Sequence, residues 1–159
     1  MTIDQINITN LSDKDLASFR NKNMGFIFQF HELLPEFTAL ENVCLPTWIG
    51  NKSTKNTKNN AMELLKRLGV DNRASHKPTE LSGGEQQRVA VARALVNNPK
   101  IVFADEPSGN LDSKNANQLH DLFFELRKER GFSFVIVTHN EGLAKRADRT
   151  ISLKDGLVI

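Results

Sequence analysis

The sequence predicts an α/β fold with a mostly parallel sheet and flanking helices. Two short apolar runs, Ile101 to Ala104 and Phe134 to Val137, look like strands buried on both faces, as parallel strands usually are. Between them, Ser113 to Arg130 predicts a helix that ends at Gly131. Its core stripe has helical spacing and consists of Leu119, Leu122, Phe123 and Leu126.

Length and composition predict a single domain of ordinary globular character. The 159 residues are 39% apolar and 25% charged, with a net charge of +2. Nothing in that balance calls for a nucleic acid partner. No apolar run approaches the ~18 residues of a membrane span, and Met1 to Gln5 lacks the pattern of a signal peptide. We therefore expect a cytosolic chain, in which the single cysteine, Cys44, is a buried small hydrophobe rather than a catalytic thiol.

The first forty-five residues predict four elements. Ile6 and Ile8 alternate with polar neighbours as in an edge strand, and a short helix is expected around Asp13 to Ala17. Gly25 to Phe28 is an apolar run typical of a strand, with Gln29 at its end. Ala39 to Leu45 predicts a helix with Leu40, Val43 and Cys44 on one side, which suits either core packing or a groove for a partner helix.

The middle of the chain predicts a loop followed by two helices. Asn51 to Asn60 contains only Lys, Asn, Ser and Thr, which favours a solvated loop. Ala61 to Leu68, closed by Gly69, predicts a short helix with Met62, Leu65 and Leu68 directed inward. Gly83 to Val96 predicts a longer one.

The start of that longer helix is a candidate phosphate site. Ser82 and Glu85 have the spacing of a capping box, in which each side chain satisfies a free amide. Gly83 and Gly84 leave the first-turn amides open to an anion at the positive end of the helix dipole. A capped helix without any ligand is the alternative.

Two consecutive acids end the strand that follows. Asp105 and Glu106 stand at the carboxyl end of Ile101 to Ala104, the edge where open parallel sheets bind ligands. Mg²⁺ takes oxygen ligands and is usually held by one or two carboxylates together with substrate phosphates. The alternative is that Asp105 caps the next loop and Glu106 is solvated.

Gln29 and His139 follow two other predicted strands. Each residue alone is more often an ordinary loop or hydrogen-bonded residue. Four polar residues at the ends of three apolar strands, however, favour one shared site. Beyond His139 we expect a helix from Glu141 to Ala147 and a hairpin, Ile151 to Ile159, that turns at Asp155-Gly156 and closes the sheet.

These motifs resemble those of ATP-binding cassette (ABC) ATPases in order and spacing. Leu81 to Glu85 is similar to the signature motif, Ile101 to Glu106 to the Walker B strand and Ser108 to Asp112 to the D-loop. The resemblance covers nearly the whole chain. Gly25 to Pro35, with Leu40 to Val43, most resembles the ATPase subunits of bacterial lipoprotein-releasing transporters, and macrolide-exporter and cell-division cassettes are the runners-up.

The resemblance implies a partial P-loop NTPase fold of ABC type, as a single domain over residues 1–159. Residues 30–80 would form an inserted helical subdomain that extends into the signature helix and docks on transmembrane permease subunits. Residues 99–159 would form the core with Walker B, the D-loop and the switch histidine. The implied location is the cytoplasmic face of the bacterial inner membrane.

The resemblance also gives each site residue a role in ATP hydrolysis with Mg²⁺. Glu106 would polarise the attacking water, and Gln29 and His139 would act with it near the γ-phosphate. Asp105 and Gln29 would hold Mg²⁺. The ATP of a second subunit in a head-to-tail homodimer would be bound by the signature and D-loop residues Ser82, Gly83, Gly84, Glu85 and Asp112.

One expected motif is missing. The P-loop reads G-x-x-x-x-G-K-[S/T], and none of the nine glycines is followed by Lys-Ser or Lys-Thr. The family places this loop amino-terminal to Met1, and the adenine-stacking aromatic is also missing. We therefore expect an amino-terminally truncated cassette that alone binds ATP poorly and hydrolyses it negligibly.

Two rival functions remain. ABC-type ATPases of DNA repair carry long coiled coils or zinc modules between the Q-loop and the signature, and residues 30–80 have neither heptads nor cysteine pairs, which favours transport without a nucleic acid partner. The other is a non-catalytic fragment that only docks on a membrane partner.

Overall fold

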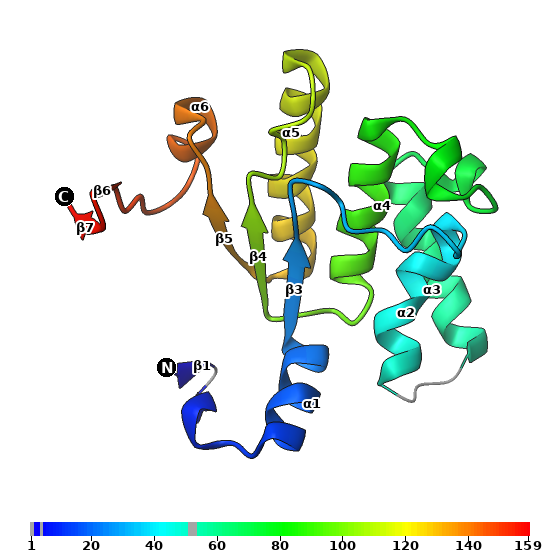
Figure 1. The fold of residues 1–159 in the computed structure, drawn as a ribbon, viewed down its shortest axis with the longest axis horizontal. Coiled ribbons are helices and arrows are strands. Elements are labelled where there is room, and N and C mark those ends of the chain that lie inside the picture. Colours follow the sequence, from blue (N-terminus) through cyan, green and yellow to red (C-terminus); the bar gives the residue numbers. More distant parts are fainter. Residues whose placement is uncertain (1, 4, 51–53) are drawn as a thin grey trace.

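The computed structural model describes residues 2–3, 5–50 and 54–159. Its centre is a parallel sheet of three strands, β3 (Met24–Ile27), β4 (Ile101–Asp105) and β5 (Ser133–Val137), in the order β3-β4-β5. The predicted α/β class and parallel sheet are thus confirmed. All three strands end at the same edge of the sheet, so the residues that follow them are brought together (Figure 1).

Two helices pack on one face of this sheet. α4 (Gly83–Leu95) lies against β3 so closely that a Cβ on Gly25 would stand 2.5 Å from the Ala94 carbonyl oxygen. α5 (Ser113–Arg130) ends at Gly131 as predicted and packs on the neighbouring strands, with the Phe123 ring 5.2 Å from that of Phe134. The buried core lies between these helices and the sheet.

The strands are not buried on both faces, which corrects the sequence prediction. Residues alternate along each strand, and Val102 and Ala104 of β4 face the helices. On the opposite face the Phe26 ring lies 5.6 Å from Phe103 and 6.3 Å from Phe28. The larger exposed side chains of this open face are Phe26, Phe28, Val135 and Val137, which are between 40% and 62% exposed.

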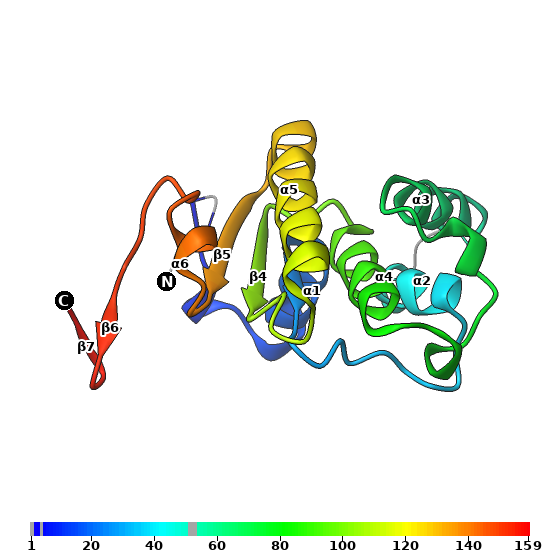
Figure 2. The same ribbon diagram turned by 90° about the horizontal axis from the view of Figure 1, so that it is seen from above.

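The helical part of the chain lies beside α4, to one side of the sheet (Figures 1 and 2). It contains α2 (Ala39–Ile49), α3 (Thr54–Arg67) and two 3-10 turns, η2 (Asp71–Arg73) and η3 (Pro78–Glu80). The predicted loop from Asn51 to Asn60 is wrong from Thr54 onward, because α3 begins there, and 51–53 lie outside the described residues.

Burial explains why this polar stretch is helical. Thr57 is buried and continues the inward stripe of α3, whose other buried residues are Ala61, Leu64, Leu65 and, just beyond the helix, Leu68. Tertiary packing of one face therefore stabilises the helix despite poor intrinsic propensity. Met62, predicted to point inward, is 37% exposed.

Both ends of the chain form small separate elements. α1 (Asp13–Asn23) confirms and extends the predicted helix, whereas β1 (Thr2–Ile3) and β2 (Ile6–Asn7) pair only with each other, and Ile8 begins the 3-10 turn η1 (Ile8–Asn10). Ile6 thus lies in a strand, as predicted, though in a separate two-stranded sheet, and the edge-strand prediction is wrong for Ile8.

The carboxyl-terminal end also differs in part from expectation. α6 (Glu141–Ala144) is shorter than predicted. The hairpin of β6 (Leu153–Lys154) and β7 (Leu157–Val158) turns where expected but forms its own sheet, away from the central one (Figure 1). It therefore does not close the sheet.

Cys44 is fully buried, and burial raises the pKa of its thiol to about 11. It is thus a small hydrophobe, as predicted, because so high a pKa leaves almost no thiolate near neutral pH. Among the described residues, no helix has the length and apolar character that a membrane span requires.

Candidate functional site

Glu106 lies just beyond the end of β4 in a constrained conformation. Its φ is 41°, in the left-handed region, and its backbone N–H donates to the Val137 carbonyl oxygen at 2.9 Å. Such a backbone costs on the order of 1–3 kcal/mol at a non-glycine residue and persists only where its surroundings hold it. This turn directs the carboxylate toward the residues that follow β5.

The Glu106 carboxylate accepts hydrogen bonds from Thr138 and His139, the two residues that directly follow β5. Its Oε1 accepts from both the backbone N–H and Nδ1 of His139, each at 2.7 Å, and its Oε2 accepts from the Thr138 hydroxyl at 3.2 Å. Because a carboxylate only accepts, Nδ1 of His139 carries a proton in this pair. The other ring nitrogen remains available at a side chain that is 85% exposed.

Gln29, two residues beyond the end of β3, is held by the D-loop. Asn110 donates from Nδ2 to the Gln29 carbonyl oxygen at 2.9 Å, and Gln29 Nε2 lies 3.5 Å from Asn110 Oδ1. Gly109 makes this approach possible, because a Cβ there would stand 2.9 Å from Gln29 Nε2. The D-loop glycine thus leaves room for the glutamine side chain.

Asp105 ends β4 with an exposed carboxylate that makes no hydrogen bond or ion pair within the described residues. A carboxylate and the Gln29 amide oxygen at the same sheet edge are a donor set that fits Mg²⁺, which usually keeps several waters and binds substrate phosphates as well. The described residues contain no cluster of three or more His, Cys, Asp or Glu side chains that could hold a metal by themselves. Asp105 and Gln29 would therefore supply two of the oxygen ligands, and water and substrate phosphates would supply the others.

The capping box at the start of α4 is formed. Glu85 Oε2 accepts from the Ser82 backbone N–H at 2.8 Å and from its hydroxyl at 2.9 Å, while Ser82 Oγ accepts from the Glu85 N–H at 3.3 Å. These bonds, and Arg73 at 2.9 Å, hold the pKa of Glu85 below its usual value. A Cβ on Gly83 would meet no atom within 4 Å, so the first turn of the helix is open to a ligand.

Two further D-loop contacts involve Asp112 and Ser108. Asp112 caps α5 by accepting from the Asn115 backbone N–H at 2.9 Å, which lowers its pKa. Ser108 Oγ lies 2.8 Å from Nε2 of the buried His120 on α5. Asp112 is thus a helix cap in this chain, whatever further contact it makes.

The structure therefore brings together Gln29, Asp105, Glu106 and His139 at one edge of the sheet. The signature residues Ser82 to Glu85 start a separate helix. A Cβ placed on Gly84 would lie 3.9 Å from the Leu111 side chain of the D-loop. Sequence reasoning missed Asn110, Thr138, Gln87 and Arg93, whose contacts join segments far apart in the chain and leave no local pattern.

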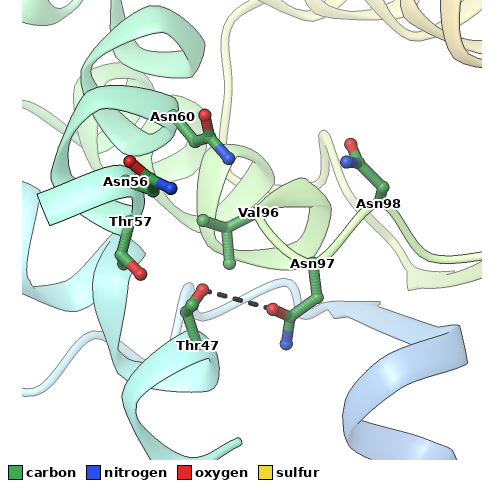
Figure 3. A pocket seen from close by; sticks show the side chains of 7 residues that line it. All are labelled: Thr47, Asn56, Thr57, Asn60, Val96, Asn97 and Asn98. Carbon is green, nitrogen blue, oxygen red and sulfur yellow. Dashed lines mark hydrogen bonds between the residues drawn. The ribbon is translucent and has the colours of Figure 1, made fainter. Parts of the chain in front are cut away.

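A pocket of about 200 Å³ lies elsewhere, at the junction of α2, α3 and the end of α4 (Figure 3). Its lining is almost entirely Asn and Thr: Thr47, Asn56, Thr57, Asn60, Val96, Asn97 and Asn98. Residues 96–98 precede β4, so this pocket is at the amino end of the strands, whereas Asp105 is at the carboxyl end. It is therefore not part of the candidate site.

Known proteins match this chain along most of its length. The sequence model of the family described as ABC transporter matches residues 1–109. The lipoprotein-releasing system ATP-binding protein LolD of Bacteroides fragilis is 58% identical over 159 residues, which are all of this chain and 74% of that protein. LolD of Cytophaga hutchinsonii is 60% identical over 152 residues, covering 96% of this chain and 69% of that protein.

A solved structure shows the same fold. A dimeric post-hydrolysis state of the ATP-binding cassette MJ0796, bound to ADP and phosphate, superimposes with a TM-score of 0.87 at 44% identity, over 98% of this chain and 69% of that one. This confirms that residues of the present chain form part of the ABC ATPase fold. The chain belongs to the ABC transporter family, among its LolD-like ATP-binding subunits.

Proposed function

We propose that this chain carries the hydrolytic edge of an ABC transporter ATP site and serves as the ATP-binding subunit of a lipoprotein-releasing system. The observation that carries the proposal is the Glu106–His139 pair beside Asp105 and Gln29 at the carboxyl edge of the sheet. The similarity to LolD proteins of several bacteria supports the choice of system over macrolide-exporter or cell-division cassettes.

ATP hydrolysis at this edge needs a positioned water and stabilised phosphate charge. Glu106 would accept a proton from the attacking water, and the exposed ring of His139 would contact the γ-phosphate. Asp105 and Gln29 would hold Mg²⁺, which when bound neutralises charge on the phosphate oxygens. Gln29 would also orient the water, because its backbone is already fixed by Asn110.

The second half of the site would come from another copy. Ser82, Gly83, Gly84, Glu85 and Asp112 would contact the ATP held by the partner subunit in a head-to-tail homodimer. The open first turn of α4 supports this role, because unshielded amides at a helix start bind phosphate. The related cassette MJ0796 is dimeric in its ADP-bound state.

The chain alone would bind ATP weakly and hydrolyse it negligibly, because its sequence contains no P-loop to cradle the phosphates. A non-catalytic docking module is therefore the second candidate. We further propose that residues 30–80 form the helical subdomain that docks on transmembrane permease subunits at the cytoplasmic face of the inner membrane, and that 99–159 form the catalytic core. The exposed apolar side chains of Phe30 and Leu34 support such docking.

Phosphate release from Mg-ATP tests the proposed catalysis in this chain extended upstream through a P-loop. Glu106→Gln is expected to reduce turnover by roughly 10²–10⁴-fold, the range for losing general base catalysis. Glu141→Gln is the matched control, because this exposed acid lies two residues beyond His139 and, among the described residues, forms an ion pair only with Lys145. Equal activity of wild type and Glu106→Gln would refute the proposed role.

A pull-down with detergent-solubilised permease subunits separates the two candidates. The docking module predicts that the present chain binds the permease while the extended, P-loop-containing form adds no ATP turnover. The catalytic proposal predicts turnover in the extended form.

A further inference from the structure

The two residues after Phe30 have an unusual backbone. His31 and Glu32 both have positive φ, 62° and 49°, a region that consecutive non-glycine residues seldom occupy. The turn is closed by the His31 N–H donating to Phe28 O at 3.2 Å and the Glu32 N–H donating to Phe30 O at 2.6 Å. A strained turn next to Gln29 persists only if its neighbours hold it.

Arg93 of α4 is one of those neighbours. Its guanidinium donates from Nη2 to the His31 carbonyl oxygen at 2.7 Å and from Nη1 to the Glu32 carbonyl oxygen. A planar guanidinium reaches two acceptors at once, which a lysine ammonium does not reproduce. One side chain thus fixes both left-handed residues.

Gln87, also on α4, contacts the same turn through the His31 side chain. His31 Nδ1 donates to Gln87 Oε1, and both side chains are buried, Gln87 with only 1% exposure. The Gln87 Nε2 is buried without a hydrogen-bond partner among the described residues. An unpaired buried donor is destabilising, so this glutamine is poorly explained by core packing alone.

We infer that Arg93 and Gln87 are positioning residues for Gln29. Their hydrogen bonds connect the segment after β3 to α4, the helix that begins with the signature residues. The position of Gln29 relative to the start of α4 is therefore fixed within one subunit. The inference deepens the proposed function and rests on it for the importance of Gln29. The contact itself requires no nucleotide.

Nuclear magnetic resonance of the full chain, without nucleotide, tests the inference. The readouts are the side-chain amide signals of Gln29 and Asn110 and hydrogen exchange of the His31 and Glu32 backbone amides. Arg93→Ala is expected to shift the side-chain signals and to speed exchange by about tenfold or more, because the turn then opens locally at low cost.

Arg88→Ala is the matched control. Arg88 lies on the same helix and also donates to a backbone carbonyl, that of Leu68, at 3.2 Å. This contact is remote from Gln29, so Arg88→Ala is expected to leave the four signals unchanged. If Arg93→Ala does not fold, Arg93→Lys is used instead, with a smaller shift in the same direction expected.

A second substitution separates positioning from general stability. Asparagine adopts the left-handed conformation more readily than glutamate, so Glu32→Asn is expected to restore the signals in the Arg93→Ala background. Unchanged signals in both Arg93 variants, equal changes in Arg88→Ala, or failure of Glu32→Asn to restore them would each overturn the inference. None of these results depends on ATP binding, so they are distinguishable from failure of the proposed function.

Discussion

Glu106 holds His139 through a single carboxylate oxygen, which accepts from the backbone N–H and from Nδ1 of the histidine, each at 2.7 Å. These residues are thirty-three positions apart and meet because β4 and β5 are adjacent parallel strands. The proposed base is therefore oriented by the residue proposed to sense phosphate. Glu106 follows β4 and His139 follows β5, both at the sheet edge where the candidate site lies.

Gly109→Ala is expected to displace Gln29. The new methyl group would stand 2.9 Å from Gln29 Nε2, and a flexible side chain moves more readily than the D-loop backbone. We expect the Gln29 side chain to turn away from Asn110 in a crystal structure of the variant. The matched control is Gly83→Ala, whose methyl group meets no atom within 4 Å. An unmoved Gln29 in Gly109→Ala would show that the D-loop yields instead.

The capping box predicts a pH dependence of stability. Hydrogen bonds to the Glu85 carboxylate, above all the one from the Ser82 backbone N–H, lower the pKa of Glu85 in the folded chain below its ordinary value of 4.5. The stabilisation is therefore present above pH 4.5 and lost as the pH falls through the lower, folded pKa. Urea unfolding from pH 7 to 3 is expected to show that the difference between wild type and Glu85→Gln shrinks with acidification.

Two variants complete that measurement. Ser82→Ala is expected to destabilise the chain by about 1 kcal/mol at neutral pH, the usual contribution of an N-cap. Glu36→Gln is the control, because Glu36 is exposed and makes no hydrogen bond or ion pair within the described residues. A Glu85→Gln difference that stays constant across the whole pH range would contradict the assignment.

The open face of the sheet predicts self-association. Parallel sheets are normally covered on both faces, and Phe26, Phe28, Val135 and Val137 leave an apolar surface here. Sedimentation velocity is expected to show association that grows with concentration and weakens in the Val135→Thr/Val137→Thr variant. Val158→Thr, on the separate hairpin, serves as control because Val158 is 71% exposed outside this face. A monomeric wild type at all concentrations would refute the prediction.

Local patterns predicted much of the fold. Gly83 to Val96, Ser113 to Arg130 and the strands that end at the candidate site were all placed within a few residues, because helical spacing, caps and short apolar runs are local signals. Only the second half of the helix α3 was predicted, as Ala61 to Leu68, and its first half was missed because the polar residues there have low helix propensity. Thr57 and Ala61, eight and four positions before Leu65, carry the only hint of its buried stripe.

Properties set by distant neighbours could not be predicted in the same way. Whether Val135 and Val137 are buried depends on what covers the sheet, not on the strand itself. The contacts of Gln29 with Asn110, and of His31 with Gln87, join residues more than fifty positions apart. The sequence therefore indicated which residues gather at the site but not which side chains hold them there.

Calorimetric titration of Mg-ATP tests the central claim most directly, with the purified chain and the form extended upstream through a P-loop measured side by side. The account predicts binding only to the extended form, because Gln29, Asp105, Glu106 and His139 supply no cradle for the phosphates by themselves. Comparable binding to both forms would contradict the account, since other residues would then hold the nucleotide.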